Sequence, residues 1–181
     1  MAISSGRFHT CVILDNGAVS CWGGGAAGTL GYGGTSDKTT PTLTSSLGTG
    51  RTAVALSSGG YHTCAILDNG DVSCWGWNID GQLGNGGTSD KTTPTLTSSL
   101  GTGRTAVAIS SGMAHTCVIL DNGAVSCWGS AGHGQLGNGG TSLKKSPTLT
   151  SSLGTGRTAA CLLYTSPSPR DISGSRMPSS A

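Results

Sequence analysis

Cysteine is the residue type whose spacing in this chain most clearly points to chemistry. In the stretch HTCVILDNGAVSCWG, residues 9–23, Cys11 and Cys21 lie on either side of an Asp-Asn-Gly sequence. Two cysteines that face each other can form a disulfide, whereas two that point apart remain buried thiols. With His9, the same pair could also contribute ligands to a metal ion. The choice among these three depends on how the chain turns between the cysteines.

The Asp-Asn-Gly sequence predicts a three-residue hairpin loop with its glycine in the left-handed conformation. Such a loop pairs Leu14 with Ala18, and counting outward from this pair places Cys11 directly opposite Cys21. Opposed residues of antiparallel strands have Cβ atoms about 4.5 to 5.5 Å apart, close to what a disulfide requires. A two-residue Asn-Gly loop would instead oppose Cys11 to Trp22. We therefore favour a disulfide, with buried reduced cysteines and a metal site as the alternatives.

The same stretch occurs three times, beginning at residues 9, 62 and 115, so the chemistry belongs to a repeated unit. We expect cysteines to pair within each unit, as Cys11–Cys21, Cys64–Cys74 and Cys117–Cys127, with Cys161 left over. Disulfides persist in oxidising compartments. An extracellular or cell-surface location is therefore predicted, although no signal peptide is visible in the sequence.

A period of 53 residues runs through the chain and divides it into units 1–53, 54–106 and 107–159. The first unit opens in the middle of a phrase that the later units contain. Residues 160–181 have no counterpart in any unit and are rich in proline, so we expect a disordered tail. Its sequence is typical of the non-native endings that translated adapters add to environmental reading frames, with a genuine C-terminal extension as the alternative.

Each unit contains four strand signals, which in the second unit lie at 51–58, 62–67, 71–76 and 93–100. The chain has 32 glycines, abundant Ser and Thr, and no helical periodicity, so an all-β fold is predicted. Four short strands per unit fit one blade of a β-propeller. A β-solenoid is the alternative, but it needs shorter coils. We therefore predict three four-stranded blades of a partial, open β-propeller.

The series SSGGYHTCAILDNGDVSCWGWNIDGQLGNG, residues 57–86, resembles the regulator of chromosome condensation repeat family. The matching features are His62, an Asn-Gly turn, a Trp-Gly pair and the ending Asn-x-x-Gly-Gln-Leu-Gly. The resemblance covers residues 1–159 and is weakest in the first unit, where Thr29 stands in the place of Gln. It implies a seven-bladed propeller, which three units cannot close. The chain is then expected to be a fragment, or an arc that needs the remaining blades or another copy to complete the ring.

Two aromatic residue types recur at fixed positions of the repeat, namely Trp22, Trp75 and Trp128, and His9, His62 and His115. Clustered tryptophans serve the ultraviolet photoreceptor of the resembled family, but at this position we interpret them as packing residues of the blades. The histidines are interpreted as structural residues that bond a neighbouring backbone.

Composition argues against several classes of function. The net charge is +2 and no basic face is apparent, so a nucleic-acid partner is not expected. The sequence has no run of 18 apolar residues, so membrane insertion is not expected either. It contains no Glu, and the Asp residues of the repeated turns serve those turns, so no nucleophile, base and orienting group converge. We predict a protein that is not an enzyme and has no cofactor or metal.

The near-identity of the units makes their differences informative. Substitutions gather at the dipeptides 7–8, 60–61 and 113–114 and at the loops 24–29, 77–82 and 130–135. The hairpin should bring both places to one end of the blade, opposite the constant Asp-Asn-Gly turns, as in a repeat scaffold with one binding face. The candidate contacts for a protein partner are Phe8, Tyr61, Trp77, Asn78, Asp80 and His133. Neutral drift in exposed loops is the alternative.

These observations together predict a propeller-repeat scaffold for protein–protein interaction within a larger secreted or cell-surface protein. A structural surface repeat protein without a dedicated ligand and an auxiliary domain of a larger enzyme are the alternatives.

Overall fold

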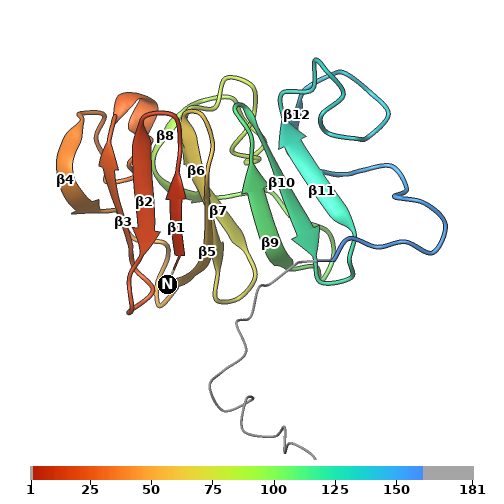
Figure 1. Cartoon of the computed structure of the whole chain (residues 1–181), viewed down its shortest axis with the longest axis horizontal. Helices are drawn as coiled ribbons and strands as arrows, with labels where there is room; N and C mark the ends of the chain where they lie inside the picture. The colour runs from red at the N-terminus through yellow and green to blue at the C-terminus, as the bar shows by residue number, and fades with distance from the viewer. Residues whose placement is uncertain (1, 161–181) are drawn as a thin grey trace, which may run out of the picture.

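Strands make up the fold of this chain, and they form three separate sheets. The computed structural model describes residues 2–160. Each sheet has four antiparallel strands in chain order, and the sheets stand side by side with their strands running between the same two ends of the molecule (Figure 1). The predicted all-β fold of three four-stranded propeller blades is thereby confirmed. Of the tail predicted at 160–181, residues 161–181 lie outside the described residues.

Corresponding strands recur in the three blades. The first blade contains β1 (Ala2–Ser5), β2 (His9–Ile13), β3 (Val19–Gly23) and β4 (Lys38–Leu43), with a short 3-10 helix, η1 (Ala26–Gly28), before β4. The second contains β5 (Ala53–Ser58), β6 (His62–Leu67), β7 (Val72–Gly76) and β8 (Lys91–Leu96). The third contains β9 (Ala106–Ser111), β10 (His115–Leu120), β11 (Val125–Gly129) and β12 (Lys144–Leu149). Each blade is thus built from consecutive strands of one stretch of chain.

The hairpin between β2 and β3 has the register that a three-residue loop gives. The Leu14 amide donates to the Ala18 carbonyl over 2.8 Å, and Gly17 has a φ of 78°, in the left-handed region. Cys11 consequently lies opposite Cys21, with their Cα atoms 4.1 Å apart. The structure joins the opposed cysteines of each blade in disulfides, which are Cys11–Cys21, Cys64–Cys74 and Cys117–Cys127.

The outer strand of the second blade begins and ends earlier than its sequence predicts. β8 begins at Lys91 and ends at Leu96, whereas sequence reasoning placed this strand at 93–100. The reason is that the Ser98 amide donates to the Gly84 carbonyl of a loop, over 2.8 Å, and so leaves the β7 ladder. Pro94 is tolerated here because an outermost strand has one edge without a partner strand, where a missing N–H costs no ladder bond.

The hydrophobic core lies between neighbouring blades. Trp75 of the second blade is fully buried and packs with Cys11, Ile13 and Leu30 of the first. Trp128 of the third blade packs in the same way against the second. Each indole Nε1–H donates to a carbonyl of the preceding blade, Trp75 over 3.0 Å and Trp128 over 2.8 Å. Trp75 and Trp128 therefore pack the blades together, as their position in the repeat predicts.

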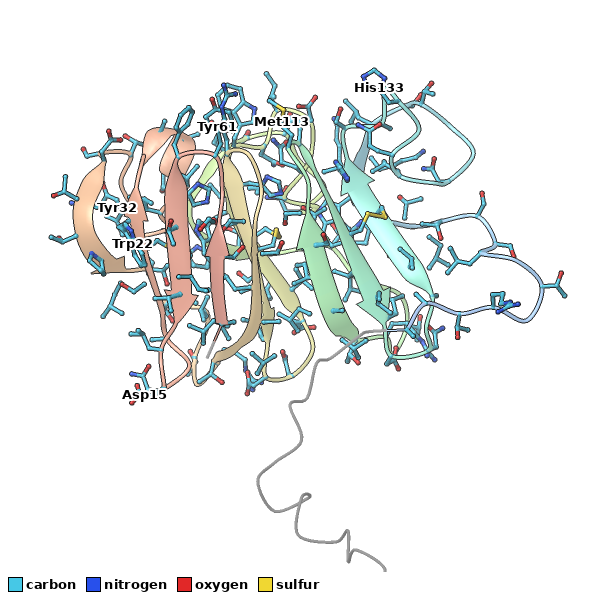
Figure 2. All side chains as sticks on the ribbon, viewed as in Figure 1. Asp15, Trp22, Tyr32, Tyr61, Met113 and His133 are labelled. Atoms are coloured by element: carbon cyan, nitrogen blue, oxygen red, sulfur yellow. A yellow bond between two sulfur atoms is a disulfide. The ribbon has the colours of Figure 1, made fainter. Side chains whose placement is uncertain are left out.

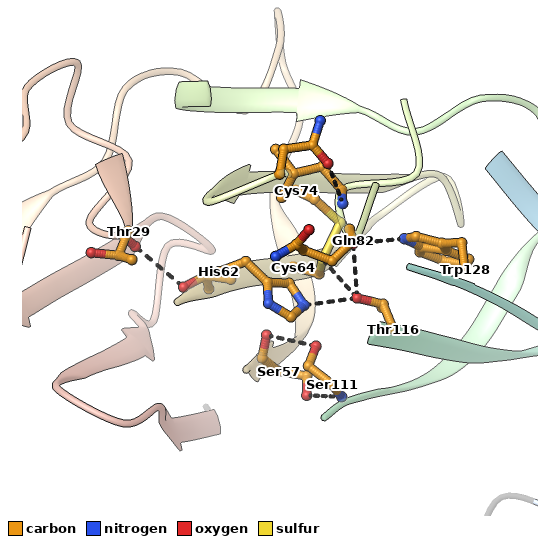
Figure 3. Close-up of a disulfide and its surroundings, with 12 residues drawn as sticks. Thr29, Ser57, His62, Cys64, Cys74, Gln82, Ser111, Thr116 and Trp128 are labelled. Carbon is orange, nitrogen blue, oxygen red and sulfur yellow. Dashed lines mark hydrogen bonds between the residues drawn. A yellow bond between two sulfur atoms is a disulfide. The ribbon is translucent and has the colours of Figure 1, made fainter. Parts of the chain in front are cut away.

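A buried hydrogen-bond chain accompanies Trp75 and Trp128, and Figure 3 shows the one at Trp128 beside the Cys64–Cys74 disulfide. His62 Nε2 lies 2.8 Å from Thr116 Oγ1 of the next blade, and that hydroxyl donates to the Gln82 carbonyl over 3.0 Å. Because the Thr116 hydrogen is directed to the carbonyl, His62 Nε2–H must be the donor in the first bond. His9 bonds Thr63 across the preceding boundary in the same way, also over 2.8 Å. His9 and His62 are thus bonded to a side chain of the next blade, and not to a neighbouring backbone as sequence reasoning expected.

Burial keeps these histidines neutral. Desolvation lowers the pKa of His9 to about 4 and, with weaker contributions from the neighbouring histidines, the pKa of His62 to about 3. Among residues 2–160, His62 Nδ1 is the one buried side-chain nitrogen or oxygen without a hydrogen-bond partner. It is the unprotonated nitrogen of the neutral ring, since Nε2 carries the hydrogen.

Candidate functional site

The variable dipeptide and the variable loop of each blade lie next to each other. The Gly24 amide donates to the Phe8 carbonyl over 2.7 Å, and the Trp77 amide to the Tyr61 carbonyl over 2.9 Å. Figure 2 shows Tyr61, Met113 and His133 along one end of the molecule and Asp15 at the opposite end. We call this surface, formed by residues 7–8, 24–29, 60–61, 77–82, 113–114 and 130–135, the variable end.

Three aromatic rings form a row on the variable end. Phe8 and Tyr61 occupy corresponding positions of adjacent blades, immediately before the buried histidine, and their ring centroids are 5.9 Å apart. Tyr61 is 5.9 Å from Trp77, in a tilted arrangement. Phe8 is 60% exposed and Trp77 39%. The structure therefore brings together three of the six predicted contact residues in one partly exposed cluster, the aromatic row.

Sequence reasoning missed three further exposed residues of this surface. Ile79 is 61% exposed and Met113 is 66% exposed. The Arg7 guanidinium carbon lies 5.0 Å from the Phe8 ring centroid and 5.7 Å from that of Tyr61, which is within the range of cation–π attraction. All three residues occupy variable positions, so the comparison of the repeats contained the signal that would have identified them.

Asn78 does not belong to the exposed set, contrary to the sequence-based expectation. It is fully buried, and its side-chain nitrogen donates to Asn85, Gly87 and Ser89 over 3.1 to 3.2 Å. Its side-chain oxygen accepts from the Leu83 amide over 3.0 Å. A partner could reach this amide only by breaking the bonds that hold its loop. Asn78 therefore shapes the variable end from beneath and is not part of its exposed surface.

Asp80 and His133 occupy corresponding positions of the second and third blades. Asp80 is half-buried and His133 is exposed, and each backbone amide donates to a glutamine two residues later, over 3.0 and 2.8 Å. His133 lies on the third blade, apart from Tyr61, with Met113 between them (Figure 2). The structure thus places Asp80 on the loop that follows Trp77 and leaves His133 away from the aromatic row.

A cavity of about 500 Å³ opens on the variable end between the first and second blades. Phe8 and Tyr61 line it together with His9, Thr29 and Asp37. Asp37 Oδ1 accepts a hydrogen bond from the Gly25 amide over 2.9 Å, which fixes the carboxylate beside the cavity. We call this space the blade 1–2 cavity. Sequence reasoning did not select Asp37, because it lies in a segment that the first two units share.

Within residues 2–160, no three His, Cys, Asp or Glu side chains come together in a group suited to a metal ion. Over that part of the chain, no helix has the length and apolar character needed to cross a membrane.

The repeats match known family models. Residues 16–66 and 69–119 match the regulator of chromosome condensation (RCC1) repeat. A second model of the same repeat matches residues 2–29, 53–82 and 106–135. These matches cover all three blades and more than half of the chain.

Two proteins illustrate the curated relatives. The ultraviolet-B receptor UVR8 of Arabidopsis thaliana is 37% identical over 142 residues, which are 78% of this chain and 32% of the receptor. The human E3 ubiquitin-protein ligase HERC2 is 35% identical over 142 residues, which are 78% of this chain and 3% of the ligase. The chain thus spans about a third or less of the length of these relatives.

Solved structures share the arrangement of the blades. Yeast RCC1 (Prp20) with Kap60 bound superimposes with a TM-score of 0.75 at 18% identity, over 85% of this chain and 37% of that one. A second structure of Prp20p from Saccharomyces cerevisiae, a protein whose binding to Gsp1p and histones has been described, gives 0.73 at 18% identity, over 85% and 39% of the two chains. At this level of identity the likeness shows the fold.

Proposed function

The chain belongs to the regulator of chromosome condensation repeat family, and we propose that it is a non-catalytic propeller scaffold that binds a protein partner at its variable end. The observation that carries this proposal is the partly exposed aromatic row of Phe8, Tyr61 and Trp77. The framework around it is almost the same in each repeat. Variation is concentrated where these rings lie, as expected for a scaffold that presents one binding surface.

The physical argument starts from the exposure of apolar surface. Large exposed apolar side chains are unfavourable in water, and a contiguous patch of them is typical of an interaction site. Trp and Tyr contribute disproportionately to binding energy in protein interfaces. The three rings already pack against one another at 5.9 Å, so little side-chain entropy is lost when a partner covers them.

The disulfides support a proposal about location. Three disulfides in one small fold are stable in an oxidising compartment, and we propose that the scaffold is part of a larger secreted or cell-surface protein. We also propose that units 1–53, 54–106 and 107–159 each supply one blade. The remaining blades, or another copy of the chain, would complete the ring.

A second candidate role is that of an auxiliary domain in a larger enzyme. The relative HERC2 is named a ubiquitin ligase, and this chain corresponds to 3% of it. In that case the blades would still act by binding, and the chemistry would belong to another domain.

Selection from a displayed random peptide library on the oxidised full chain tests the proposal. We expect the selected peptides to lose at least about tenfold in affinity when Tyr61→Ala or Trp77→Ala is introduced. Leu96→Ala is the matched control, because Leu96 is a 53% exposed apolar side chain on β8, outside the variable end. Peptides that bind Tyr61→Ala and Trp77→Ala as well as the original chain would refute the proposal.

A further inference from the structure

The blade 1–2 cavity allows the chemistry of the partner to be specified. Building on the proposed function, we propose that this cavity receives a cationic side chain, lysine or arginine, of the protein partner. The aromatic walls would bind the cation through their ring faces, and Asp37 would neutralise its charge.

The cavity lies where the first blade lacks a side chain that the second blade carries. Gly24 corresponds to Trp77 of the second blade, and Gly60 corresponds to Met113 of the third. A Cβ on Gly24 would lie 3.2 Å from the Phe8 Cβ on the wall of the cavity, whereas a Cβ on Gly60 would face the Met113 carbonyl of the third blade, at 2.7 Å. The absence of a side chain at Gly24 therefore helps to leave a space of about 500 Å³ beside Phe8, Tyr61 and Asp37, which is within the size range of ligand sites in proteins.

The charge of the cavity favours a cation. Asp37 is an exposed carboxylate that uses Oδ1 to accept from the Gly25 amide. The other polar groups of the lining add no positive charge. Thr29 donates its hydroxyl hydrogen to the Gly24 carbonyl over 2.6 Å. His9 is neutral at physiological pH because burial lowers its pKa to about 4.

The aromatic walls are suited to the same ligand. Phe8 and Tyr61 already hold one cation, the Arg7 guanidinium, at 5.0 and 5.7 Å from their centroids. Both rings line the cavity, whereas Arg7 is not among its lining residues. A lysine or arginine stem is also apolar, and it would cover the ring surface while its charged end reaches Asp37.

The test uses the oxidised full chain and four peptides that differ only at one central position, which is Lys, Arg, norleucine or Glu. Binding is followed by the NMR shifts of the Phe8, Asp37 and Tyr61 amides. We expect the Lys and Arg peptides to bind at least about fivefold more tightly than the norleucine peptide, and the Glu peptide to bind most weakly. Equal binding of Lys and norleucine, or preference for Glu, would overturn the inference.

Two matched variants separate charge from structure. Asp37→Asn keeps an oxygen for the Gly25 amide but removes the charge, so it should abolish the preference for Lys and Arg over norleucine. Asp90→Asn makes the same change in the second blade, where Asp90 Oδ1 accepts from the Asn78 amide over 2.8 Å, and should leave the preference intact. Equal effects of the two variants would contradict the inference. Ala26→Trp, which should fill the cavity from its exposed rim, should abolish binding of the cationic peptides while the aromatic row remains.

The outcomes also distinguish this inference from the proposed function. If library peptides depend on Tyr61 and Trp77 but contain no cation that depends on Asp37, the scaffold proposal stands and the cavity assignment fails. If no selected peptide depends on the aromatic row, the proposed function itself fails.

Discussion

Acid should destabilise the fold through its buried histidines. His9 and His62 are each buried at a blade boundary, with pKa values lowered to about 4 and about 3. Because the folded pKa lies below the unfolded value of 6.5, the unfolded chain binds more protons at any pH below that value. The contribution of the neutral histidines is therefore fully present above about pH 6.5 and is lost as the pH falls toward the folded pKa.

The size of the effect follows from these values. Each histidine should remove about 1.4 kcal/mol from the free energy of unfolding per pH unit within this window. Between about pH 6.5 and pH 4 the loss is about 3 kcal/mol for each of His9 and His62, which is a large part of the 5–15 kcal/mol that stabilises a typical domain. A cationic ring would also lie beside buried groups that are arranged for a neutral one.

Urea unfolding, followed by tryptophan fluorescence at several pH values, measures this loss. His62→Gln offers an N–H to Thr116 without a titrating ring, and should remove about 1.4 kcal/mol per pH unit from the slope. His133→Gln is the control, because His133 is exposed, and it should leave the slope unchanged. If His62→Gln retains the pH slope of the original chain, the assignment of a neutral buried His62 is wrong.

Three further outcomes follow from the packing and the disulfides. Trp128→Ala should lower the free energy of unfolding by about 3–5 kcal/mol in urea titrations, because Trp128 is fully buried. Trp22→Ala, at the corresponding but half-buried position, should lower it clearly less. Equal losses for the two variants would contradict the packing. Ellman titration of the denatured, unreduced chain should find about one free thiol among seven cysteines, and seven thiols would remove the argument for an oxidising compartment. Asp68→Asn should change the free energy of unfolding by less than about 1 kcal/mol, because the ion pair of Asp68 with Arg51, at 3.2 Å, is partly exposed. A larger loss would show that this pair stabilises the fold more than surface ion pairs usually do.

The hairpins were predictable from sequence because their geometry is local. The Asp-Asn-Gly loop fixes the register between β2 and β3, and the register alone places Cys11 opposite Cys21. The identical spacing in each repeat then extended the prediction to all three blades. The position of the variable end followed from the same hairpin, since two segments that flank one hairpin return to the same end of a sheet.

Features that depend on the next blade were not predictable in this way. The histidines bond threonines about one repeat away, and no local pattern identifies that partner. Asn78 was mistaken for a surface residue because its burial depends on how its loop folds back over it. The blade 1–2 cavity depends on the absence of a side chain at Gly24, which has meaning only once the blades are placed side by side.

Hydrogen–deuterium exchange of the oxidised chain, alone and saturated with a selected peptide, tests most directly whether binding occurs at the variable end. We expect slower exchange on binding at residues 7–9, 24–29, 60–61 and 77–82. The Asp-Asn-Gly turns at 15–17, 68–70 and 121–123 should exchange equally in both states, because they lie at the opposite end of the blades. Protection confined to those turns, or to the outer strands β4, β8 and β12, would contradict the account.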